Sequence, residues 1–203
     1  MQYFVTGATG FIGKRLVKKL LARRGSTVYF LMRESSQAKL PDLLSYWGVN
    51  KTRAIPVFGD LTGKKLGVAP DVIKSLKGNI DHLYHLAAVY DLGADEESQV
   101  AANIDGTRSM IEFAQAIDAG HVHHVSSIAA AGLYEGVFRE DMFDEAENLD
   151  HPYFMTKHES EKLVRSSCKQ PWTVYRPALV VGDSHTGEMD KIDGPYYFFK
   201  LIQ

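Results

Sequence analysis

Near its amino terminus the chain reads Thr6-Gly7-Ala8-Thr9-Gly10-Phe11-Ile12-Gly13. A short β-rich run, Gln2 to Thr6, leads into this glycine-rich segment, and Phe11 to Arg24 follows it with apolar residues at helical spacing. Glycines permit a tight turn, and backbone N–H groups at the start of a helix can bind a pyrophosphate. The spacing G-x-x-G-x-x-G differs by one residue from the G-x-G-x-x-G fingerprint of dinucleotide-binding proteins. It still allows the tight turn and places backbone N–H groups at the start of the helix. The segment predicts a strand, a phosphate-binding turn and a helix; the alternative is a glycine-rich turn without a ligand.

Strand and helix patterns alternate along the rest of the chain. Thr27 to Met32 is a continuous apolar run, as expected of a strand covered on both faces. Further strands are predicted at Ala54 to Phe58, His82 to Leu86, His121 to Ser126 and Trp172 to Arg176, and helices at Ala38 to Trp47, Asp71 to Lys77, Glu96 to Ala119 and Tyr153 to Cys168. This alternation predicts an α/β, Rossmann-type fold, a doubly wound parallel sheet with right-handed crossovers. Gly132 to Pro152 lacks periodicity and is acidic, which predicts a solvated loop.

The composition indicates one globular domain spanning residues 1-203. Of the 203 residues, 45% are hydrophobic and 24% charged, and 23 basic against 25 acidic side chains give a net charge of −2. Without a basic surplus we expect no nucleic acid as a partner. The longest apolar runs fall short of the roughly 20 residues that cross a bilayer, so neither a membrane span nor secretion is expected. A single cysteine, Cys168, suits a cytoplasmic protein.

The end of the second predicted strand bears on the choice of dinucleotide. An acidic residue about 20 positions after the turn would hold the ribose 2′-hydroxyl of NAD, whereas an arginine there can accept the 2′-phosphate of NADP. Here the strand ends in Arg33, followed by Glu34. Arg33 favours NADP(H), Glu34 leaves NAD open, and an ordinary surface arginine is a further interpretation. With Arg33, the candidate cofactor residues near the turn are Gly7, Thr9, Gly10, Phe11, Ile12 and Gly13.

Seven short segments, in order, resemble the extended short-chain dehydrogenase/reductase superfamily. They are the glycine-rich segment, Gly59-Asp60-Leu61, Leu86-Ala87-Ala88, Asn103-Ile104-Asp105-Gly106-Thr107, Ser126-Ser127, Tyr153-Phe154-Met155-Thr156-Lys157 and Tyr175-Arg176-Pro177. Each is weak alone, but together they span nearly the whole chain. The resemblance implies hydride supply by a nicotinamide, with Ser127, Tyr153 and Lys157 as catalytic residues.

Tyr153 and Lys157 also make chemical sense as a pair. Four residues apart on one predicted helix, they share a face. A lysine ammonium near the phenol favours the phenolate and lowers a pKa that is about 10 unperturbed, which prepares the tyrosine for acid and base work. Ser127, at the end of the preceding strand, can hydrogen-bond a substrate oxygen, and Ser126 stays open in its place. The competing interpretation is a surface pair on an amphipathic helix.

The resemblance also implies cofactor contacts, which we carry over by position in the family motifs. The adenine would be flanked by Asp60 and Leu61, the ribose and pyrophosphate would lie beside Ala87 and Ala88, and the nicotinamide would be bordered by Pro177 to Val180, with Asn103 supporting the geometry and Tyr153 and Lys157 also in contact. The simpler interpretations are that Ala87 and Ala88 are small residues in a packed strand end and that Asn103 is an ordinary polar helix residue.

Three longer stretches narrow the resemblance. His82 to Asp91, Val125 to Gly132 and Gly182 to Tyr197 look like the male-sterility and thioester-reductase branch, most of all the N-terminal reductase domain of bacterial alcohol-forming fatty acyl-CoA reductases. The resemblance implies reduction of a fatty acyl-CoA or fatty aldehyde by NADPH. A sugar-nucleotide epimerase or dehydratase with bound NAD stays open, although Arg33 argues against it. A non-catalytic NADP-sensing module also stays open, but it would not need the three catalytic residues together.

The length of the chain and its last residues raise two further expectations. Members of the branch carry more chain than this one, so we expect a fragment that lacks most of the substrate-binding part. The apolar residues from Tyr196 to Ile202 would favour self-association into a homo-oligomer.

The histidines show no metal-binding pattern in the sequence. His123 and His124 are neighbours on a predicted strand, so they should point to opposite faces of the sheet. We therefore expect no metal site.

Overall fold

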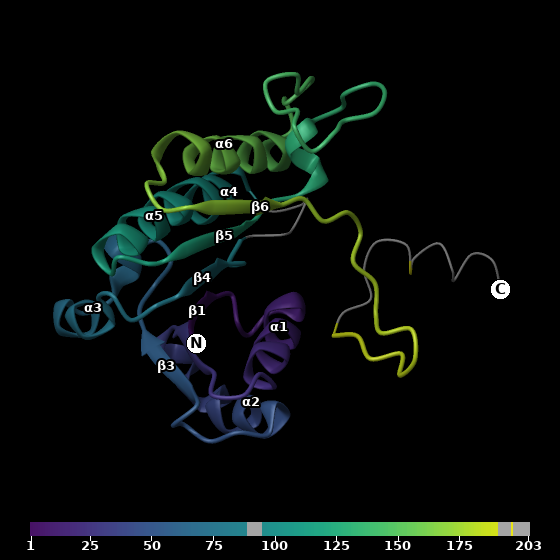
Figure 1. Ribbon diagram of the computed structural model, residues 1–203. Helices are drawn as coiled ribbons and strands as arrows, with labels where there is room; N and C mark the ends of the chain where they lie inside the picture. Colours follow the sequence, from purple (N-terminus) through teal and green to yellow (C-terminus); the bar gives the residue numbers. More distant parts are fainter. Residues whose placement is uncertain (89–94, 191–195, 197–203) are drawn as a thin grey trace.

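Figure 1 shows the computed structural model, which describes residues 1–88, 95–190 and 196. Parallel strands form one six-stranded sheet in the order β3-β2-β1-β4-β5-β6. Their bounds are Gln2–Thr6 (β1), Thr27–Met32 (β2), Ala54–Phe58 (β3), His82–His85 (β4), His121–Val125 (β5) and Trp172–Tyr175 (β6). This strand order is that of the doubly wound dinucleotide-binding fold, so the predicted α/β, Rossmann-type class is confirmed.

Helices cover both faces of the sheet (Figure 1). The α-helices are Phe11–Leu21 (α1), Leu40–Trp47 (α2), Pro70–Leu76 (α3), Glu96–Gln99 (α4), Gly106–Ala116 (α5) and Pro152–Ser167 (α6). Shorter turns of 3₁₀ helix are η1 (Glu34–Lys39), η2 (Lys64–Gly67) and η4 (Ile128–Ala131), and a π-helical turn is η3 (Val100–Asp105).

Strands β1, β2 and β3 pack side chains into both cores, one on each face of the sheet. In β1, Phe4 packs in the core under α5, where its ring lies 4.7 Å from that of Phe113, whereas Val5 belongs to the core under α1 and α2. In that second core Phe30 meets Trp47 of α2 edge to face. Burial on both faces explains why β1, β2 and β3 are largely apolar rather than alternating in polarity.

The centre of the sheet positions the site. β1 pairs with β4, Thr6 opposite His85, although 79 residues separate them. The chain leaves β1 toward α1 on one face and leaves β4 toward α4 and α5 on the other, which opens a crevice at the carboxyl ends of the strands. Doubly wound sheets bind their ligands at such a point.

Three predicted helices were partly wrong. The single helix expected from Glu96 to Ala119 is α4, η3 and α5 in succession, because a wider π turn interrupts it and hydrophobic spacing does not reveal one extra residue. The helix expected to reach Arg24 ends at Leu21, since a turn with Gly25 at φ 69° follows. The helix expected from Ala38 starts as a 3₁₀ turn at Glu34.

Residues 133–151 form the predicted solvated loop between η4 and α6. The acidic side chains are exposed, whereas Met142 and Phe143 are buried and anchor the loop. Gly132 pairs with Glu147 at its base and has φ 65°; a Cβ at Gly132 would lie 1.9 Å from the Glu147 carbonyl oxygen. The base of the loop therefore requires glycine.

Two further expectations concern self-association and membrane-spanning helices. The segment from Tyr196 to Ile202, expected to favour self-association, lies outside the described residues except for Tyr196. Within the ranges 1–88 and 95–190, none of the helices has the length and apolar character needed to cross a membrane.

Candidate active site

The glycine-rich turn forms a cradle of backbone atoms between β1 and α1. Gly7 has φ 72°, and a Cβ there would lie 2.7 Å from the amide nitrogen of Ala87. A Cβ at Gly13 would lie 2.0 Å from the Gly7 carbonyl oxygen. Gly10 caps α1 without a side-chain hydrogen bond, and the first turn of α1 carries no acidic residue. The helix start therefore offers uncapped N–H groups that fit an anionic group such as a pyrophosphate.

Thr6 ties this turn to the end of β4. Its Oγ1 accepts a hydrogen bond of 3.2 Å from the Ala87 amide and shares one of 2.8 Å with Nδ1 of the buried His85. The other ring nitrogen of His85 lies 3.3 Å from Thr107 Oγ1 on α5. Burial lowers the pKa of His85 well below its usual value, so the ring is neutral and serves to hold β1, β4 and α5 together.

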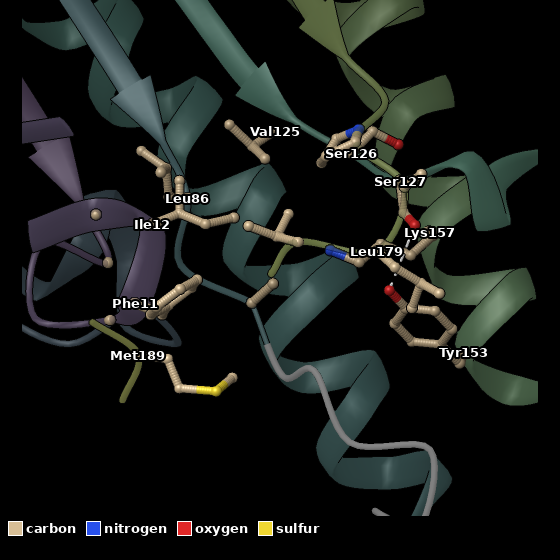
Figure 2. A pocket seen from close by; sticks show the side chains of 17 residues that line it. Phe11, Ile12, Leu86, Val125, Ser126, Ser127, Tyr153, Lys157, Leu179 and Met189 are labelled. Carbon is tan, nitrogen blue, oxygen red and sulfur yellow. Dashed lines mark hydrogen bonds between the residues drawn. The ribbon is translucent and has the colours of Figure 1, made fainter. Parts of the chain in front are cut away.

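A cavity of about 320 Å³ opens at the carboxyl ends of β1, β4 and β5. In Figure 2, Phe11, Ile12 and Leu86 lie on one side of it, and Ser127, Lys157 and Tyr153 on the other. Of the candidate residues from the sequence, the cavity is lined by Gly7, Gly10, Phe11, Ile12, Gly13, Ala88, Ser127, Tyr153, Lys157, Pro177 and Val180. Thr9, Arg33, Asp60, Leu61, Ala87 and Asn103 lie outside its lining.

Ser127 and Tyr153 face each other across the cavity edge. The Tyr153 hydroxyl donates to Ser127 Oγ at 3.5 Å, the dashed line in Figure 2. Ser127 caps η4, and its Oγ accepts from the Ala129 amide. Ser126 is buried, and its Oγ has no hydrogen-bond partner among the described residues. Of the two serines, Ser127 is the one that meets the tyrosine.

Lys157 lies one helical turn after Tyr153 on α6 and is only 5% exposed. Burial lowers the pKa of its ammonium to about 8. Beside it the ring of the buried His124 stacks on His85 at 5.5 Å. Burial, and then the charge of Lys157, lower the pKa of His124 to about 3, so it is neutral at pH 7. Lys157 therefore brings the positive charge to this end of the site.

Asn103 braces α6 from the π turn. It is buried, and its Nδ2 donates to Thr156 Oγ1 at 3.2 Å. The Thr156 hydroxyl in turn lies 3.3 Å from the Tyr153 carbonyl oxygen. The π turn η3 thus connects to the backbone of the residue that carries the phenol.

Three further candidates, Arg33, Asp60 and Leu61, follow the ends of β2 and β3. Arg33 is exposed at the start of η1. The pKa of Asp60 is lowered mainly by the backbone and side-chain hydrogen bonds from Thr62 and also by the charge of Arg33. Leu61 packs over Gly106, where a Cβ would come within 2.7 Å of Leu61 Cγ. Arg33 and Asp60 are therefore close enough for their charges to interact, outside the lining of the cavity.

Comparison with known proteins decides the family, because a model described as male sterility protein matches residues 5–203. The chain belongs to the male sterility protein family. It is 31% identical to a linear gramicidin synthase of Brevibacillus parabrevis over 93% of this chain and 4% of that protein, and 26% identical to the fatty acyl-CoA reductase wat of Drosophila melanogaster over 95% of this chain and 46% of that protein. The terminal R domain of the myxalamid PKS-NRPS pathway superposes with a TM-score of 0.84 at 30% identity, covering 98% of this chain and 54% of that one.

Membership in the male sterility family confirms the predicted branch of NAD(P)-binding proteins. The chain spans about half the length of the fatty acyl-CoA reductase and of the R-domain structure, and a small part of the synthase.

Ala178 and Leu179 line the cavity together with the rest of the predicted segment from Pro177 to Val180. Sequence reasoning missed Leu86, Val125 and Met189, which this male sterility protein also places at the site. Leu86 precedes Ala87 in one of the family motifs, so a signal existed for it. Met189 had none. It reaches the cavity because residues 178–190, the strap, return to α1, where Asp190 pairs with Lys14 at 2.5 Å and Arg15 at 3.2 Å.

The structure also bears on the histidines. His123 and His124 do point to opposite faces: His123 stacks on Tyr84 at 4.2 Å, away from the face where His124 meets His85. Within the described part of the chain, no three His, Cys, Asp or Glu side chains are placed to hold a metal ion.

Proposed function

We propose that the protein is an NADPH-dependent reductase of long-chain fatty acyl-CoA, fatty aldehyde or both, with the fatty alcohol as the final product. The observation that carries the proposal is the meeting of Tyr153 and Ser127 across 3.5 Å at the edge of the cavity, with buried Lys157 one helical turn away. Relatives named as a fatty acyl-CoA reductase and as an R domain support this class of chemistry.

The chain's own residues suit the cofactor NADP(H). The uncapped start of α1 would hold the pyrophosphate. Gly7 and Gly13 allow the turn to pack closely against Ala87 and against itself, because a Cβ at either position would collide with backbone atoms. Exposed Arg33 would pair with the 2′-phosphate, which favours NADPH over NADH. Asp60 and Leu61 would flank the adenine.

Tyr153, Ser127 and Lys157 would stabilise the negative charge that develops on the carbonyl oxygen. When bound, NADPH supplies the hydride that the carbonyl carbon accepts. The Tyr153 hydroxyl donates its proton to the developing oxyanion, and the Ser127 hydroxyl donates a hydrogen bond to the same oxygen. Lys157 stabilises the phenolate that remains. With a thioester, the resulting hemithioacetal releases the thiol and leaves an aldehyde.

The rim of the cavity suits an apolar acyl group. Ile12, Leu179 and Val180 line the cavity, yet they are 40%, 63% and 47% exposed. Apolar side chains open to solvent at the mouth of a site favour an apolar ligand, because its binding removes them from water. Ile12 and the segment from Pro177 to Val180 are also cofactor candidates, so the nicotinamide and the acyl group would share this surface.

The test is NADPH oxidation, followed by absorbance, by the natural full-length protein with a long-chain acyl-CoA and, separately, with a long-chain aldehyde. Tyr153→Phe should abolish the activity. Tyr46→Phe, a change on α2 outside the cavity lining, is the matched control and should retain it. Protein that binds NADPH but oxidises it with neither substrate would refute the proposal. Oxidation with an acyl group on a carrier protein, but not on CoA, would correct the thiol carrier.

A further inference from the structure

A buried carboxylate joins the catalytic helix to the wall of the cavity. Glu161 follows Lys157 by four residues and Tyr153 by eight on α6, so the three share one side of the helix. Its side chain is 0% exposed. Burial tends to raise the pKa of Glu161, but the hydrogen bonds and charges of Arg176 and Arg165 outweigh it and lower the pKa, so the group is ionised at neutral pH.

Two arginines neutralise this carboxylate. Arg176 binds it with both prongs of its guanidinium, Nη2 to Oε1 at 2.7 Å and Nε to Oε2 at 3.1 Å. Arg165 adds a bond of 2.9 Å from Nε to Oε1. Charge-assisted, two-pronged contacts of this kind fix direction as well as distance.

Only Arg176 leads directly into the cavity. It lies between Tyr175 and Pro177, and Pro177 begins the cavity-lining segment that ends at Val180. The Ser126 amide donates to the Tyr175 carbonyl at 2.8 Å, and the Ile128 amide donates to the Pro177 carbonyl at 3.2 Å. Tyr175 and Pro177, which flank Arg176, thus accept hydrogen bonds from Ser126 and Ile128, which flank Ser127.

Arg176 also reaches the loop of residues 133–151. Its Nη2 donates to the Met142 carbonyl at 2.8 Å, and its guanidinium lies 5.2 Å from the ring centre of Phe138. Arg165 instead packs over Phe143 and Trp172, and neither of those residues lines the cavity. The same carboxylate therefore has one partner connected to the site and one that is not.

We propose that Glu161 and Arg176 are positioning residues of the reaction. The pair holds the segment from Pro177 to Val180, and Ser127 beside it, at a fixed distance from Tyr153 and Lys157. This inference rests on the proposed function and adds a role to residues outside the cavity. Small displacements of reacting groups are costly, since about 1 Å of misplacement can slow a reaction about a hundredfold.

The test compares Arg176→Gln with Arg165→Gln in the full-length protein. Each variant removes one arginine from the same buried carboxylate, so both are expected to lower the melting temperature. Arg176→Gln should lower kcat at least tenfold with little change in KM for the acyl-CoA, whereas Arg165→Gln should keep kcat near the wild-type value. Arg176→Lys keeps the charge but loses the two-pronged contact, so it should fold and still show a reduced kcat. Glu159→Gln, on the same helix outside the cavity lining, is the control for a lost surface carboxylate.

A binding measurement makes the inference independent of turnover. Calorimetry with NADPH and with adenosine 2′,5′-bisphosphate compares the whole cofactor with its adenosine end. Arg176→Gln should weaken NADPH binding several-fold and leave the adenosine fragment unchanged. Equal loss of kcat in the two glutamine variants, or an unchanged kcat and NADPH affinity in both Arg176 variants, would show that the pair is only structural. A wild-type protein inactive on every substrate would refute the proposed function instead, and the calorimetry would still decide the inference.

Discussion

Lys157 brings an ammonium into the interior beside Tyr153, where its side chain is 5% exposed. An unfolded lysine has a pKa of about 10.4, and burial lowers that of Lys157 to about 8. The charge that would support the tyrosine therefore destabilises the fold at neutral pH. This is the expected conflict between a site and its scaffold.

The conflict gives a pH dependence of stability. Between about pH 8 and about pH 10.4 the unfolded chain binds more protons at Lys157 than the folded chain does, so the stability that this residue contributes rises with pH there and is lost as the pH falls through about 8. Relative to Lys157→Met, the free energy of unfolding of the wild type should gain about 1.4 kcal/mol per pH unit across this window. Urea unfolding of both proteins at several pH values measures it, and parallel curves would contradict a lowered pKa.

The adjacent serines give a second prediction at this scale. Ser127→Ala removes the hydroxyl that meets Tyr153, so kcat should fall by about 10²- to 10³-fold, the usual effect of losing one donor to an oxyanion. Ser126→Ala removes a buried hydroxyl that does not meet the phenol and should cost much less. Steady-state kinetics of both variants decide between them, and a larger loss in Ser126→Ala would reverse the assignment.

Sequence reasoning was uneven for single residues. The spacing of Tyr153 and Lys157 predicts a shared helix face, and the structure has them on one side of α6 at the cavity. The sequence favoured Ser127 over Ser126 but left Ser126 open, because neighbours on an extended chain differ only in direction. Likewise, Glu161 and Arg176 give no local signal: their contact joins a helix to a strand end and exists only after both are packed.

Whole elements were predictable where local chemistry marks their ends. α6 starts at Pro152, and His151 Nδ1 accepts a hydrogen bond from the Tyr153 amide, so its start was predicted within one residue. The π turn at Val100–Asp105 was not predictable from hydrophobic spacing, and its Asn103 contacts Thr156 of α6, 53 residues away in the sequence. A long-range contact can hold a helical irregularity that its own sequence does not encode.

Substitution of Gly132, which ends the 3₁₀ turn that Ser127 begins, tests the close packing at this turn. Gly132→Ala puts a Cβ within 1.9 Å of the Glu147 carbonyl oxygen, at φ 65° and ψ −135° where residues other than glycine are strained, so it should lower the free energy of unfolding by more than about 2 kcal/mol. Gly48 also has a positive φ, 66°, but its ψ of 33° is in the αL region and a Cβ there would meet no atom within 4 Å beyond its chain neighbours, so Gly48→Ala should cost only the backbone strain of about 1 to 2 kcal/mol. Thermal unfolding compares the two, and equal losses would contradict the close approach at Gly132.

At the scale of the whole molecule, the alternation of strand and helix patterns predicted all six strands, and the continuous apolar run of β2 fits a strand with core on both faces of the sheet. The strap was not predictable. It returns to α1 through exposed charges, and Lys14 and Asp190 are 176 residues apart in the sequence. Such contacts have no periodicity and contribute little energy, so the sequence pattern does not reveal them.

Removing the contacts of the strap with α1 should therefore change the free energy of unfolding only slightly. Asp190→Asn removes the partner of Lys14 and Arg15, and partly exposed ion pairs contribute about 0 to 1 kcal/mol each. The free energy of unfolding should fall by no more than about 1 kcal/mol, less at high salt, while protease cleavage within residues 178–190 should become faster. Asp141→Asn, in a more exposed pair, is the control and should change neither. A loss above about 2 kcal/mol would contradict a surface attachment.

The central pairing of β1 with β4 also has a consequence for how the chain folds. Thr6 ties the glycine turn to His85, and the candidate catalytic groups come from residues still later in the chain. Contacts of such long sequence separation close late, because the entropy of loop closure must be met first. Early folding intermediates should therefore lack the dinucleotide site. A ligand that binds only the assembled site stabilises the native state as a whole. Its apparent affinity for the total protein therefore reports the fraction of molecules that are folded.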